Sequence, residues 1–247
     1  MKLLLDLGNT RLKWGTQVAA ETVVGIDAHA WSDDLGETLA GAWSTLPKPD
    51  GVWAASVVDA AREAQVAAAV EAQWALPVHW VRTPARGCGV EVAYAQPDTM
   101  GVDRFLGLVA ARAEGHAPCI LASAGTALVL DALAKDGRHL GGLIAPGAWL
   151  MQTSVLGAAA RVRPAAPGQL VDAGASTADG LVSGCWQACA ALVDRFATRM
   201  AARLDGTPTL LLGGGDAETL IPLLEHAAVA CPNAVLRGLA VWAAAEA

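Results

Sequence analysis

The chain begins with MKLLLDLGNTRLK, residues 1–13, and this stretch predicts how the fold starts. The apolar run Leu3–Leu5 indicates a strand that ends at Asp6, and a second apolar run begins at Leu12. Gly8 and Asn9 between the runs favour a tight turn, because both residue types tolerate the positive φ that a hairpin can demand. We therefore predict a strand, a turn and a second strand, with a carboxylate beside the turn.

The same turn offers groups that can hold phosphate. Its backbone N–H groups, the Thr10 hydroxyl and the Lys13 ammonium can bind phosphate oxygens. The carboxylate of Asp6 can hold Mg²⁺, a hard cation that prefers oxygen ligands. Short turns of this kind also occur in hairpins that bind nothing. From these residues alone, a phosphate site and a plain hairpin turn both remain open.

Composition limits the class of protein. The 247 residues are 54% hydrophobic, which is enough to bury one large core or two small ones. The formal charge of -7, with 17 Lys and Arg and no basic block, argues against nucleic acid as the main partner. No stretch approaches the ~18 apolar residues of a membrane span. Five cysteines without a C-x-x-C pair are typical of a reducing cytosol, so we expect a cytoplasmic protein.

Short apolar strands alternate with alanine-rich helices along the chain, which is the pattern of an α/β fold. Beyond the opening hairpin, strands are predicted at 52–58, 78–81, 120–122, 128–130 and 209–212. Helices are predicted at 59–76, 103–112, 149–160 and 179–204, with a further helix opening after the glycines at 213–215. Residues 161–174, rich in proline, glycine and alanine, are expected to form an exposed loop.

The pattern of the opening hairpin recurs after Gly115. An apolar strand at 120–122, the turn Gly125-Thr126 and a strand that ends at Asp131 repeat the order of the first elements. We therefore predict two similar domains, residues 1–115 and 116–247, with a cleft between them.

Three later motifs join the opening turn. In Gly101-Val102-Asp103-Arg104, Asp103 can cap a helix N-terminus, with Arg104 on the surface. The same pair can instead accept a proton from an alcohol and hold an anionic substrate group. Gly125-Thr126 and Gly214-Gly215-Asp216 each follow an apolar strand, where glycine permits either an ordinary turn or the close approach of a nucleotide. Tyr94, the only tyrosine, favours a packing role when it is considered alone.

Taken in order, these motifs resemble type III pantothenate kinase. The matching residues are Asp6-x-Gly8-Asn9-Thr10-x-x-Lys13, Tyr94 with Pro97, Gly101-x-Asp103-Arg104, Gly125-Thr126-Ala127, Gly141-Gly142-x-Ile144-x-Pro146-Gly147, Thr177 and Gly214-Gly215-Asp216-Ala217. Each motif is short, but the ordered set is specific and spans most of the chain. That family belongs to the superfamily of acetate and sugar kinases, heat-shock proteins and actin. The resemblance therefore implies two ribonuclease-H-like domains, a nucleotide cleft between them and a homodimer.

The resemblance also implies a role for each matching residue. The ATP phosphates would be held by Asp6, Leu7, Gly8, Asn9, Thr10, Arg11, Leu12 and Lys13, with Asp6 on magnesium, and Thr126 would also meet the nucleotide. The pantothenate pocket would be lined by Tyr94, Gly101, Val102, Asp103 and Arg104, and by Thr177 from the partner subunit. Asp103 would be the general base.

One position departs from the family pattern. The family usually has an aspartate two positions before the glycine of the third motif, where it binds a monovalent cation, and this chain has Ser123 there. A hydroxyl is a weaker cation ligand than a carboxylate. We therefore do not extend the family's potassium or ammonium requirement to this chain.

The activity that the resemblance implies is the ATP-dependent phosphorylation of pantothenate to 4'-phosphopantothenate, the first step of coenzyme A biosynthesis. Two alternatives remain. One is a kinase for another small alcohol or acid, against which the Tyr94–Arg104 segment favours pantothenate. The other is a non-catalytic nucleotide-binding protein, because some family members were first described as accessory factors for the transcription of virulence genes (Bvg accessory factors). A pure binding module would not need a base at Asp103.

Overall fold

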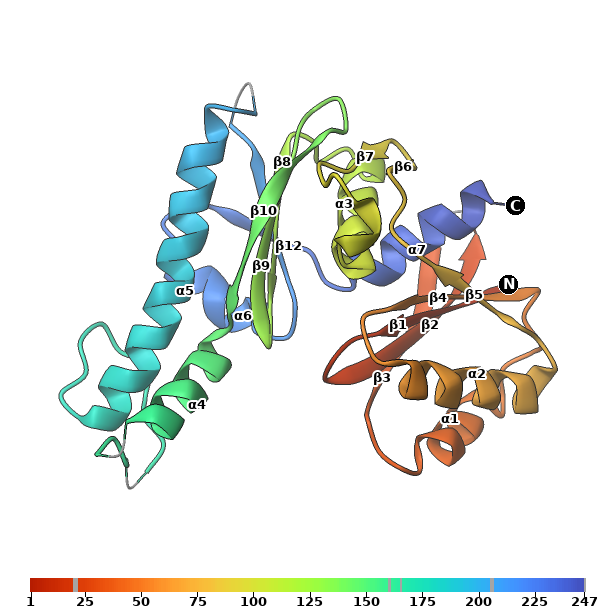
Figure 1. The fold of residues 1–247 in the computed structure, drawn as a ribbon, viewed down its shortest axis with the longest axis horizontal. Helices are drawn as coiled ribbons and strands as arrows, with labels where there is room; N and C mark the ends of the chain where they lie inside the picture. Colours follow the sequence, from red (N-terminus) through yellow and green to blue (C-terminus); the bar gives the residue numbers. More distant parts are fainter. Residues whose placement is uncertain (20–21, 160, 165, 205–206, 247) are drawn as a thin grey trace. The chain divides into compact units, whose positions relative to one another are not determined.

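A computed structural model of the chain describes residues 1–19, 22–159, 161–164, 166–204 and 207–246. The chain folds into two compact units, of which one comprises Met1–Gly115 together with Asn233–Ala247 and the other comprises His116–Pro232. Each unit is built around its own five-stranded sheet (Figure 1). No helix in the described part of the chain is both long enough and apolar enough to cross a membrane.

The sheet of the first unit has the strand order β3-β2-β1-β4-β5. Its strands are β1 (Lys2–Leu7), β2 (Arg11–Ala19), β3 (Thr22–Ala30), β4 (Gly51–Ser56) and β5 (Val78–Val81). The helices of this unit are α1 (Leu35–Trp43), α2 (Ala60–Trp74), α3 (Val102–Ala113) and α7 (Ala234–Ala245). A two-stranded ribbon, β6 (Arg86–Gly87) and β7 (Val90–Glu91), and the short helix η1 (Pro97–Thr99) lie between β5 and α3.

The core of the first unit lies between its sheet and helices α1 and α2 (Figure 1). Alternate residues of β1 turn Leu3, Leu5 and Leu7 into this core, as the period of two in a strand requires. Trp43 of α1 stacks on Trp74 of α2, with ring centroids 5.1 Å apart. These apolar contacts hold β1, the central strand of the sheet, and Asp6 is the penultimate residue of β1.

Helix α7 corrects the predicted domain boundary. The sequence assigned residues 116–247 to the second domain, but Asn233–Ala247 belongs to the first unit. Its buried face includes Leu236, Leu239 and Ala243, and α7 packs against α3 and against strands β1 and β4. The two helices approach so closely that a Cβ at Gly238 would overlap the carbonyl oxygen of Leu106.

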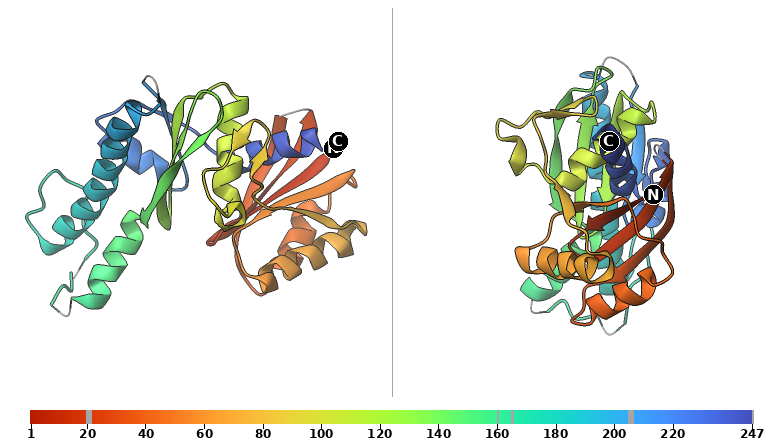
Figure 2. Two further views of the ribbon diagram at one scale, coloured as in Figure 1. Left: turned by 45° about the horizontal axis from the view of Figure 1, so that its top comes forward. Right: turned by 90° about the vertical axis from the view of Figure 1, so that its right-hand side faces the viewer.

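The sheet of the second unit has the order β10-β9-β8-β11-β12. Its strands are β8 (Cys119–Ala124), β9 (Ala127–Leu133), β10 (His139–Pro146), β11 (Thr209–Gly213) and β12 (Ala228–Ala230). Its helices are α4 (Ala148–Ala158), α5 (Thr177–Ala201), α6 (Ala217–Leu220) and the short η2 (Ile221–Leu223). Helix α5 covers one face of this sheet, and α4 runs beside α5 (Figures 1 and 2).

The two sheets repeat one topology. In the first unit β2 is antiparallel to β1 and β3, while β1, β4 and β5 are parallel. In the second unit β9 is antiparallel to β8 and β10, while β8, β11 and β12 are parallel. The recurrence that the sequence indicated is therefore real, and the predicted α/β fold with two similar domains is confirmed.

Several predicted elements agree with the structure to within a few residues. The helix predicted at 59–76 is α2, where Asp59 is the N-cap and its side chain accepts a hydrogen bond from the backbone N–H of Arg62. It ends before Pro77 because Ala75 adopts a left-handed conformation. The strand predicted to end at Asp131 continues to Leu133, and the helix predicted after residues 213–215 is only the short α6.

Candidate active site

The opening hairpin places Asp6 and Lys13 side by side. Strands β1 and β2 are antiparallel, and their register pairs Asp6 directly with Lys13. The turn between the strands is closed by the backbone N–H of Gly8, which donates to the carbonyl of Arg11 at 3.2 Å. Asn9, Thr10 and Arg11 are exposed, whereas Leu7 and Leu12 are buried in the core. The exposed part of the turn is therefore accessible to a ligand, whereas the side chains of Leu7 and Leu12 are not.

The turn reaches this shape without the backbone conformation that the sequence suggested. Positive φ occurs at other residues, and neither Gly8 nor Asn9 adopts it. Gly8 is favoured for a different reason, because a Cβ there would lie only 3.3 Å from the carbonyl oxygen of Arg11. The carbonyl of Gly8 accepts a hydrogen bond of 2.8 Å from the indole N–H of Trp31.

Asp6 lies in an unfavourable electrostatic environment. Burial, and next the negative charge of Asp103, raise the pKa of Asp6 to about 7, although the ammonium of Lys13 acts in the opposite direction. Part of the residue surface is still accessible, but the carboxyl group lies deep enough for burial to dominate. The negative charge of Asp103, on another element of the same unit, thus disfavours the ionised form of Asp6. A bound cation would relieve that repulsion.

Asp103 owes its position to the first turn of α3. Gly101 is the N-cap residue and makes no side-chain cap, and the Oδ1 atom of Asp103 accepts the backbone N–H of Arg104 at 2.8 Å. A Cβ on Gly101 would lie 2.5 Å from this oxygen, so glycine makes room for the carboxylate. The hydroxyl of Thr83 donates to the carbonyl of Met100 at 2.8 Å and secures the approach to the helix. Asp103 therefore serves the helix N-terminus, and its charge also acts on Asp6.

Arg104 is buried, which excludes the surface role that the sequence left open. Only 8% of the residue is exposed, and its Nη1 donates to the hydroxyl of Tyr94 at 2.8 Å. The guanidinium also lies 5.5 Å from the centre of the Tyr94 ring. Val102, between Gly101 and Asp103, is part of the buried core. The structure therefore joins Tyr94 to Arg104 beside Asp103, as a phenol and a cation that can act together on one ligand.

Three glycine motifs meet in the second unit. The turn at Gly125 and Thr126 joins β8 to β9, and the backbone N–H of Gly147 donates to the carbonyl of Thr126 at 2.9 Å. A Cβ on Gly147 would overlap the carbonyl oxygen of Gly125, and one on Gly214 would overlap that of Ala124. A side chain at either position would therefore clash with the neighbouring backbone. Gly214 also has a φ of +94°, which residues with a side chain rarely adopt. Thr126 is exposed on this junction.

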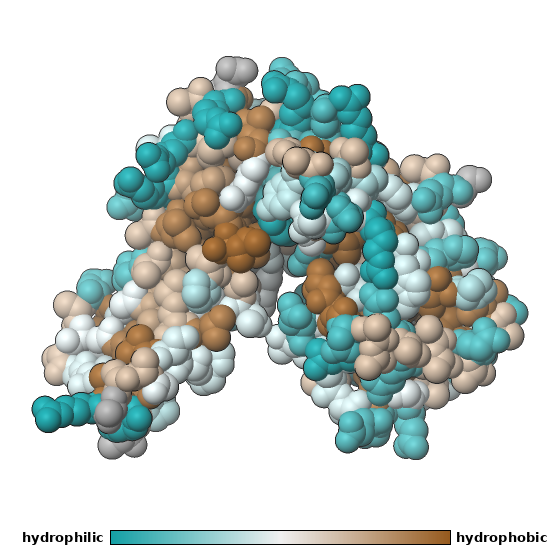
Figure 3. All heavy atoms as spheres, viewed as in Figure 1, coloured by the Kyte–Doolittle hydropathy of each residue, from teal (hydrophilic) through white to brown (hydrophobic). Residues whose placement is uncertain are grey.

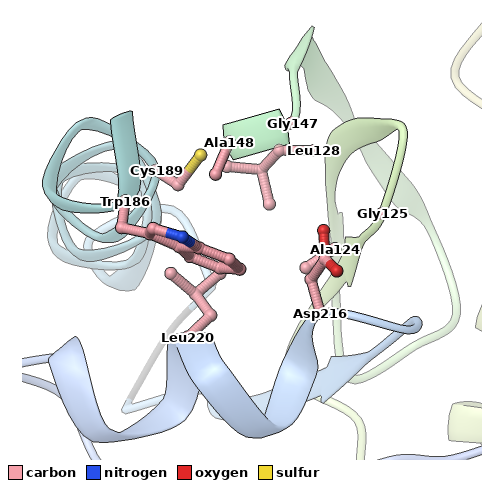
Figure 4. A pocket seen from close by; sticks show the side chains of 9 residues that line it. All are labelled: Ala124, Gly125, Leu128, Gly147, Ala148, Trp186, Cys189, Asp216 and Leu220. Carbon is pink, nitrogen blue, oxygen red and sulfur yellow. The ribbon is translucent and has the colours of Figure 1, made fainter. Parts of the chain in front are cut away.

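A small cavity lies beneath the junction (Figure 4). Its walls include the ring of Trp186 and the thiol of Cys189 from α5, and the side chain of Leu220 from α6. The carboxylate of Asp216 stands beside Ala124 at the opposite side. The space is about 10 Å³, which is room for no more than about one water molecule. It is a packing feature of the unit rather than a place for a substrate.

Ser123 and Thr177 are not among the residues that line this cavity. Ser123 is exposed near the end of β8, where it pairs with Val129 of β9 and Gly213 of β11. Thr177 is the first residue of α5 and is exposed. It lines a surface hollow of about 440 Å³ together with Arg161 and Arg163.

The segment before Thr177 is held more firmly than an exposed loop. The backbone N–H of Gln169 donates to Asp179 at 2.8 Å, and that of Val171 donates to the hydroxyl of Ser183 at 3.0 Å. The hydroxyl of Ser176 bonds to the second oxygen of Asp179 at 2.8 Å. The described part of 161–174 is thus largely exposed, as expected, but it is anchored on the first turns of α5. Residues 160 and 165 lie outside the described residues.

The structure thus brings Asp6, Lys13, Tyr94, Asp103 and Arg104 to one unit, while Ser123, Thr126 and Thr177 belong to the other. Sequence reasoning missed Trp31, whose indole holds the opening turn. No motif contains this residue, and a single tryptophan after a polar stretch gives no signal of such a contact. The charges gathered near Asp6 are suited to binding a phosphate-bound cation and to accepting a proton from an alcohol.

Comparison with known proteins shows similarity to one family along most of the chain. A model of the type III pantothenate kinase family matches residues 2–199. The type III pantothenate kinase of Burkholderia vietnamiensis is 38% identical, over 98% of this chain and 96% of its own length. That of Aromatoleum aromaticum is 39% identical, over 100% of this chain and 99% of its own length. That of Xanthomonas campestris pv. campestris is 39% identical, over 97% of this chain and 96% of its own length.

Solved structures show the same fold at much lower identity. A candidate 2-dehydro-3-deoxygalactonokinase from Sinorhizobium meliloti aligns over 100% of this chain and 99% of its own, with a TM-score of 0.65 and 16% identity. A candidate Baf family transcriptional activator from Campylobacter jejuni aligns over 96% of this chain and 94% of its own, with a TM-score of 0.60 and 18% identity. These likenesses concern the fold alone, and they agree with two ribonuclease-H-like domains.

Proposed function

This chain belongs to the type III pantothenate kinase family, and we propose that it transfers the γ-phosphoryl group of ATP to pantothenate. The product would be 4'-phosphopantothenate, and the reaction would open coenzyme A biosynthesis. The observation that supports this proposal best is the convergence of Asp6, Lys13 and Asp103, from β1, β2 and α3. Phosphoryl transfer needs little covalent chemistry from the protein, so positioning and charge are the main requirements.

We assign the nucleotide phosphates to the opening turn. The exposed backbone of Asn9 and Thr10 and the ammonium of Lys13 can meet phosphate oxygens. Thr126 of the second unit is proposed as a further nucleotide contact because its turn is exposed and allows close approach. Leu7 and Leu12 support the turn from the core and contribute backbone only.

The carboxyl groups fit a magnesium ion that arrives with ATP. Mg²⁺ usually keeps several waters and is held by one or two carboxylates together with substrate phosphates. Asp6, with Asp103 nearby, offers that donor set, and no group of three or more metal-ligating side chains occurs in the described residues. When bound, magnesium supplies positive charge that neutralises the transferring phosphoryl group. Asp6 is proposed to hold the magnesium ion. The positive charge of the ion would stabilise the ionised carboxylate of Asp6, against the effects of burial and of the Asp103 charge.

Asp103 is proposed as the general base. It would accept the proton of the primary hydroxyl of pantothenate as the hydroxyl oxygen attacks the γ-phosphorus. Arg104 and Tyr94 would bind the substrate, because a buried guanidinium held by a phenol suits the carboxylate and the polar groups of pantothenate. Gly101 leaves room for the Asp103 carboxylate and Val102 fixes the helix in the core.

A homodimer is the proposed assembly. Helix α4 is apolar along most of its length, yet Ala148 is its only buried residue. Trp149 is 69% exposed and Ile144 of β10 is 65% exposed, with Leu143, Leu150 and Val155 also exposed nearby in the sequence. In Figure 3, brown apolar atoms of the second unit gather toward its middle, and scattered brown atoms also appear at its lower left. A second copy of the chain would cover such a surface, and Thr177 would then reach the pantothenate of the partner subunit.

Two further points complete the proposal. Ser123 offers a neutral hydroxyl where the family has a carboxylate, so we propose that activity depends only weakly on potassium or ammonium. The five cysteines all lie in the described part of the chain and form no disulfide there, which suits a reducing cytoplasm. A non-catalytic accessory role is not favoured, because a binding protein gains nothing from a base at Asp103 that destabilises the charged form of Asp6.

The direct test is an ADP-release assay with purified protein, ATP and Mg²⁺, run with and without pantothenate. Pantothenate-dependent ADP release, with a product heavier than pantothenate by one phosphoryl group, is the expected result. If ADP release does not respond to pantothenate but rises with another small alcohol, that alcohol is the substrate in place of pantothenate. Nucleotide binding without any turnover would favour the accessory role.

A further inference from the structure

We propose that Trp31 is a positioning residue for the turn that binds the ATP phosphates. This proposal rests on the proposed function, because it concerns the same turn. The indole N–H of Trp31 donates to the carbonyl oxygen of Gly8 at 2.8 Å, across 23 positions of sequence. Trp31 follows β3, the strand next to β2, so the fold itself brings its ring to the hairpin.

The hydrogen bond orients the peptide that faces the ligand. A peptide group is planar, so the carbonyl of Gly8 and the N–H of Asn9 point in opposite directions from one rigid unit. Trp31 holds that carbonyl from one side, and the N–H of Asn9 is thereby directed away from Trp31. The preceding N–H, on Gly8, is already engaged with the carbonyl of Arg11. Trp31 thus fixes the first amide of the turn that remains free for phosphate.

Trp31 is itself held from two sides. Its ring packs partly against the core of the first unit, beside α1 and α2. The guanidinium of Arg62 lies 5.0 Å from the ring centre on the first turn of α2. The backbone N–H of Arg62 donates to the N-cap residue Asp59 at 2.9 Å and anchors that turn.

This arrangement makes the turn rigid before ATP binds. A preorganised donor costs little reorganisation when the phosphate arrives, and a mobile one costs entropy. Replacing Trp31 by phenylalanine keeps an aromatic ring at this position but removes the indole N–H, which leaves the Gly8 carbonyl free to turn. ATP binding should therefore weaken by about the value of one hydrogen bond, while pantothenate binding, assigned to Tyr94 and Arg104, should not change.

The test compares Trp31→Phe with Trp53→Phe. Trp53 is a matched control in the same unit, because its indole N–H donates to Glu246 at 3.4 Å and Lys2 lies 4.5 Å from its ring centre. Trp53 thus has an indole hydrogen bond and a nearby cation, as Trp31 has, but it does not contact the turn at Gly8. We expect Trp31→Phe to raise the KM for ATP by about threefold to tenfold, the equivalent of one net hydrogen bond, with the KM for pantothenate unchanged. Trp53→Phe should change neither constant.

A second measurement does not depend on turnover. In ¹H–¹⁵N spectra, the indole resonance of Trp31, assigned through its loss in Trp31→Phe, should shift when Mg²⁺ and a non-hydrolysable ATP analogue are added. The indole resonance of Trp53 should stay in place. An unchanged KM for ATP in Trp31→Phe, with wild-type activity, would overturn the positioning role and leave the proposed function intact. A wild-type protein without pantothenate kinase activity, in which the Trp31 resonance still responds to the analogue, would refute the proposed function alone.

Discussion

Replacing Asp6 by asparagine should make the protein more stable and less active. Burial and the charge of Asp103 raise the pKa of Asp6 from 3.8 to about 7, so the ionised side chain is unfavourable in the folded protein. Asparagine keeps the shape of the side chain and removes the charge. In the absence of metal and nucleotide, Asp6→Asn should therefore unfold at higher denaturant concentration than the wild type, and the gain should depend on pH.

The direction and size of the gain follow from the two pKa values. Between pH 3.8 and about 7, the folded protein keeps a proton on Asp6 that the unfolded chain has released, so wild-type stability falls as pH rises through this interval. A shift of about three pKa units corresponds to about 4 kcal/mol, at about 1.4 kcal/mol for each unit. The gain from Asp6→Asn should thus be at most about 2 kcal/mol at pH 5 and about 4 kcal/mol at pH 8. Residual solvent access to Asp6 makes both values upper bounds.

The assay is urea unfolding of both proteins in EDTA at pH 5 and pH 8. Asp33→Asn is the control, because Asp33 is an exposed acid of the same unit and its loss changes the net charge equally. When Mg²⁺ and ATP are added in place of EDTA, they should stabilise the wild type strongly. They should stabilise Asp6→Asn only a little, because the proposed magnesium ligand is lost. Asp103→Asn should give a smaller stabilisation at pH 8, since burial exceeds the Asp103 charge as the cause of the shift. Equal stability of wild type and Asp6→Asn at pH 8 would refute this account of the site.

Four further outcomes are expected. Asp103→Asn should lower kcat by about 10²–10⁴-fold while both substrates still bind, as isothermal titration can check, and more than a tenth of wild-type turnover would remove Asp103 as the base. Lys13→Ala should raise the KM for ATP more than that for pantothenate, and the reverse ranking would mean that the two substrates are assigned to the wrong motifs. Turnover in potassium or ammonium salts should exceed that in sodium by less than about twofold at fixed ionic strength; a strong rise would show that a cation site survives with Ser123. Sedimentation should give twice the chain mass of 25.2 kDa, and Trp149→Glu should shift it toward one chain, whereas a fully active wild-type monomer would contradict the dimer.

The parts of the site that were predictable from sequence are those carried by local chemistry. The apolar run before Asp6 and the turn residues after it predict β1, the turn and β2, which the structure contains. The glycine at 101 and the acid at 103 predict the start of α3, which begins at Val102. In each case a few adjacent residues determine the conformation, so a single sequence is sufficient.

Other elements were missed because their signals are weak or lie far away in sequence. Strand β3 is an exposed edge strand, and Gly25, with a φ of +62°, interrupts its register, so no clean alternation of apolar residues marks it. Strand β10 contains Gly141 and Gly142, which have no side chains to mark the alternation of a strand, and no strand was predicted there. Helix α7 has a regular apolar face, but chain order gives no sign that it returns to the first unit to pack on α3.

The electrostatics of the site were beyond sequence reasoning for a related reason. Asp6 and Asp103 are almost a hundred positions apart, and each alone has an ordinary local explanation, a strand end or a helix N-terminus. Their mutual repulsion appears only when β1 and α3 are placed in one unit. The bond from Trp31 to Gly8 is equally invisible, since it depends on how β3 leads back beside the hairpin.

The repeated topology finally sharpens the meaning of Ser123. In the first unit Asp6 lies two positions before Gly8, next to Ala55 on the parallel strand β4. In the second unit Ser123 lies two positions before Gly125, next to Gly213 on the parallel strand β11. The two residues therefore occupy equivalent places on the first strand of equivalent sheets. One place has an acid whose charge is costly without a cation, and the other has a neutral hydroxyl that costs nothing when no cation is bound. This asymmetry is the physical reason to expect a strong requirement for magnesium and a weak one for potassium or ammonium.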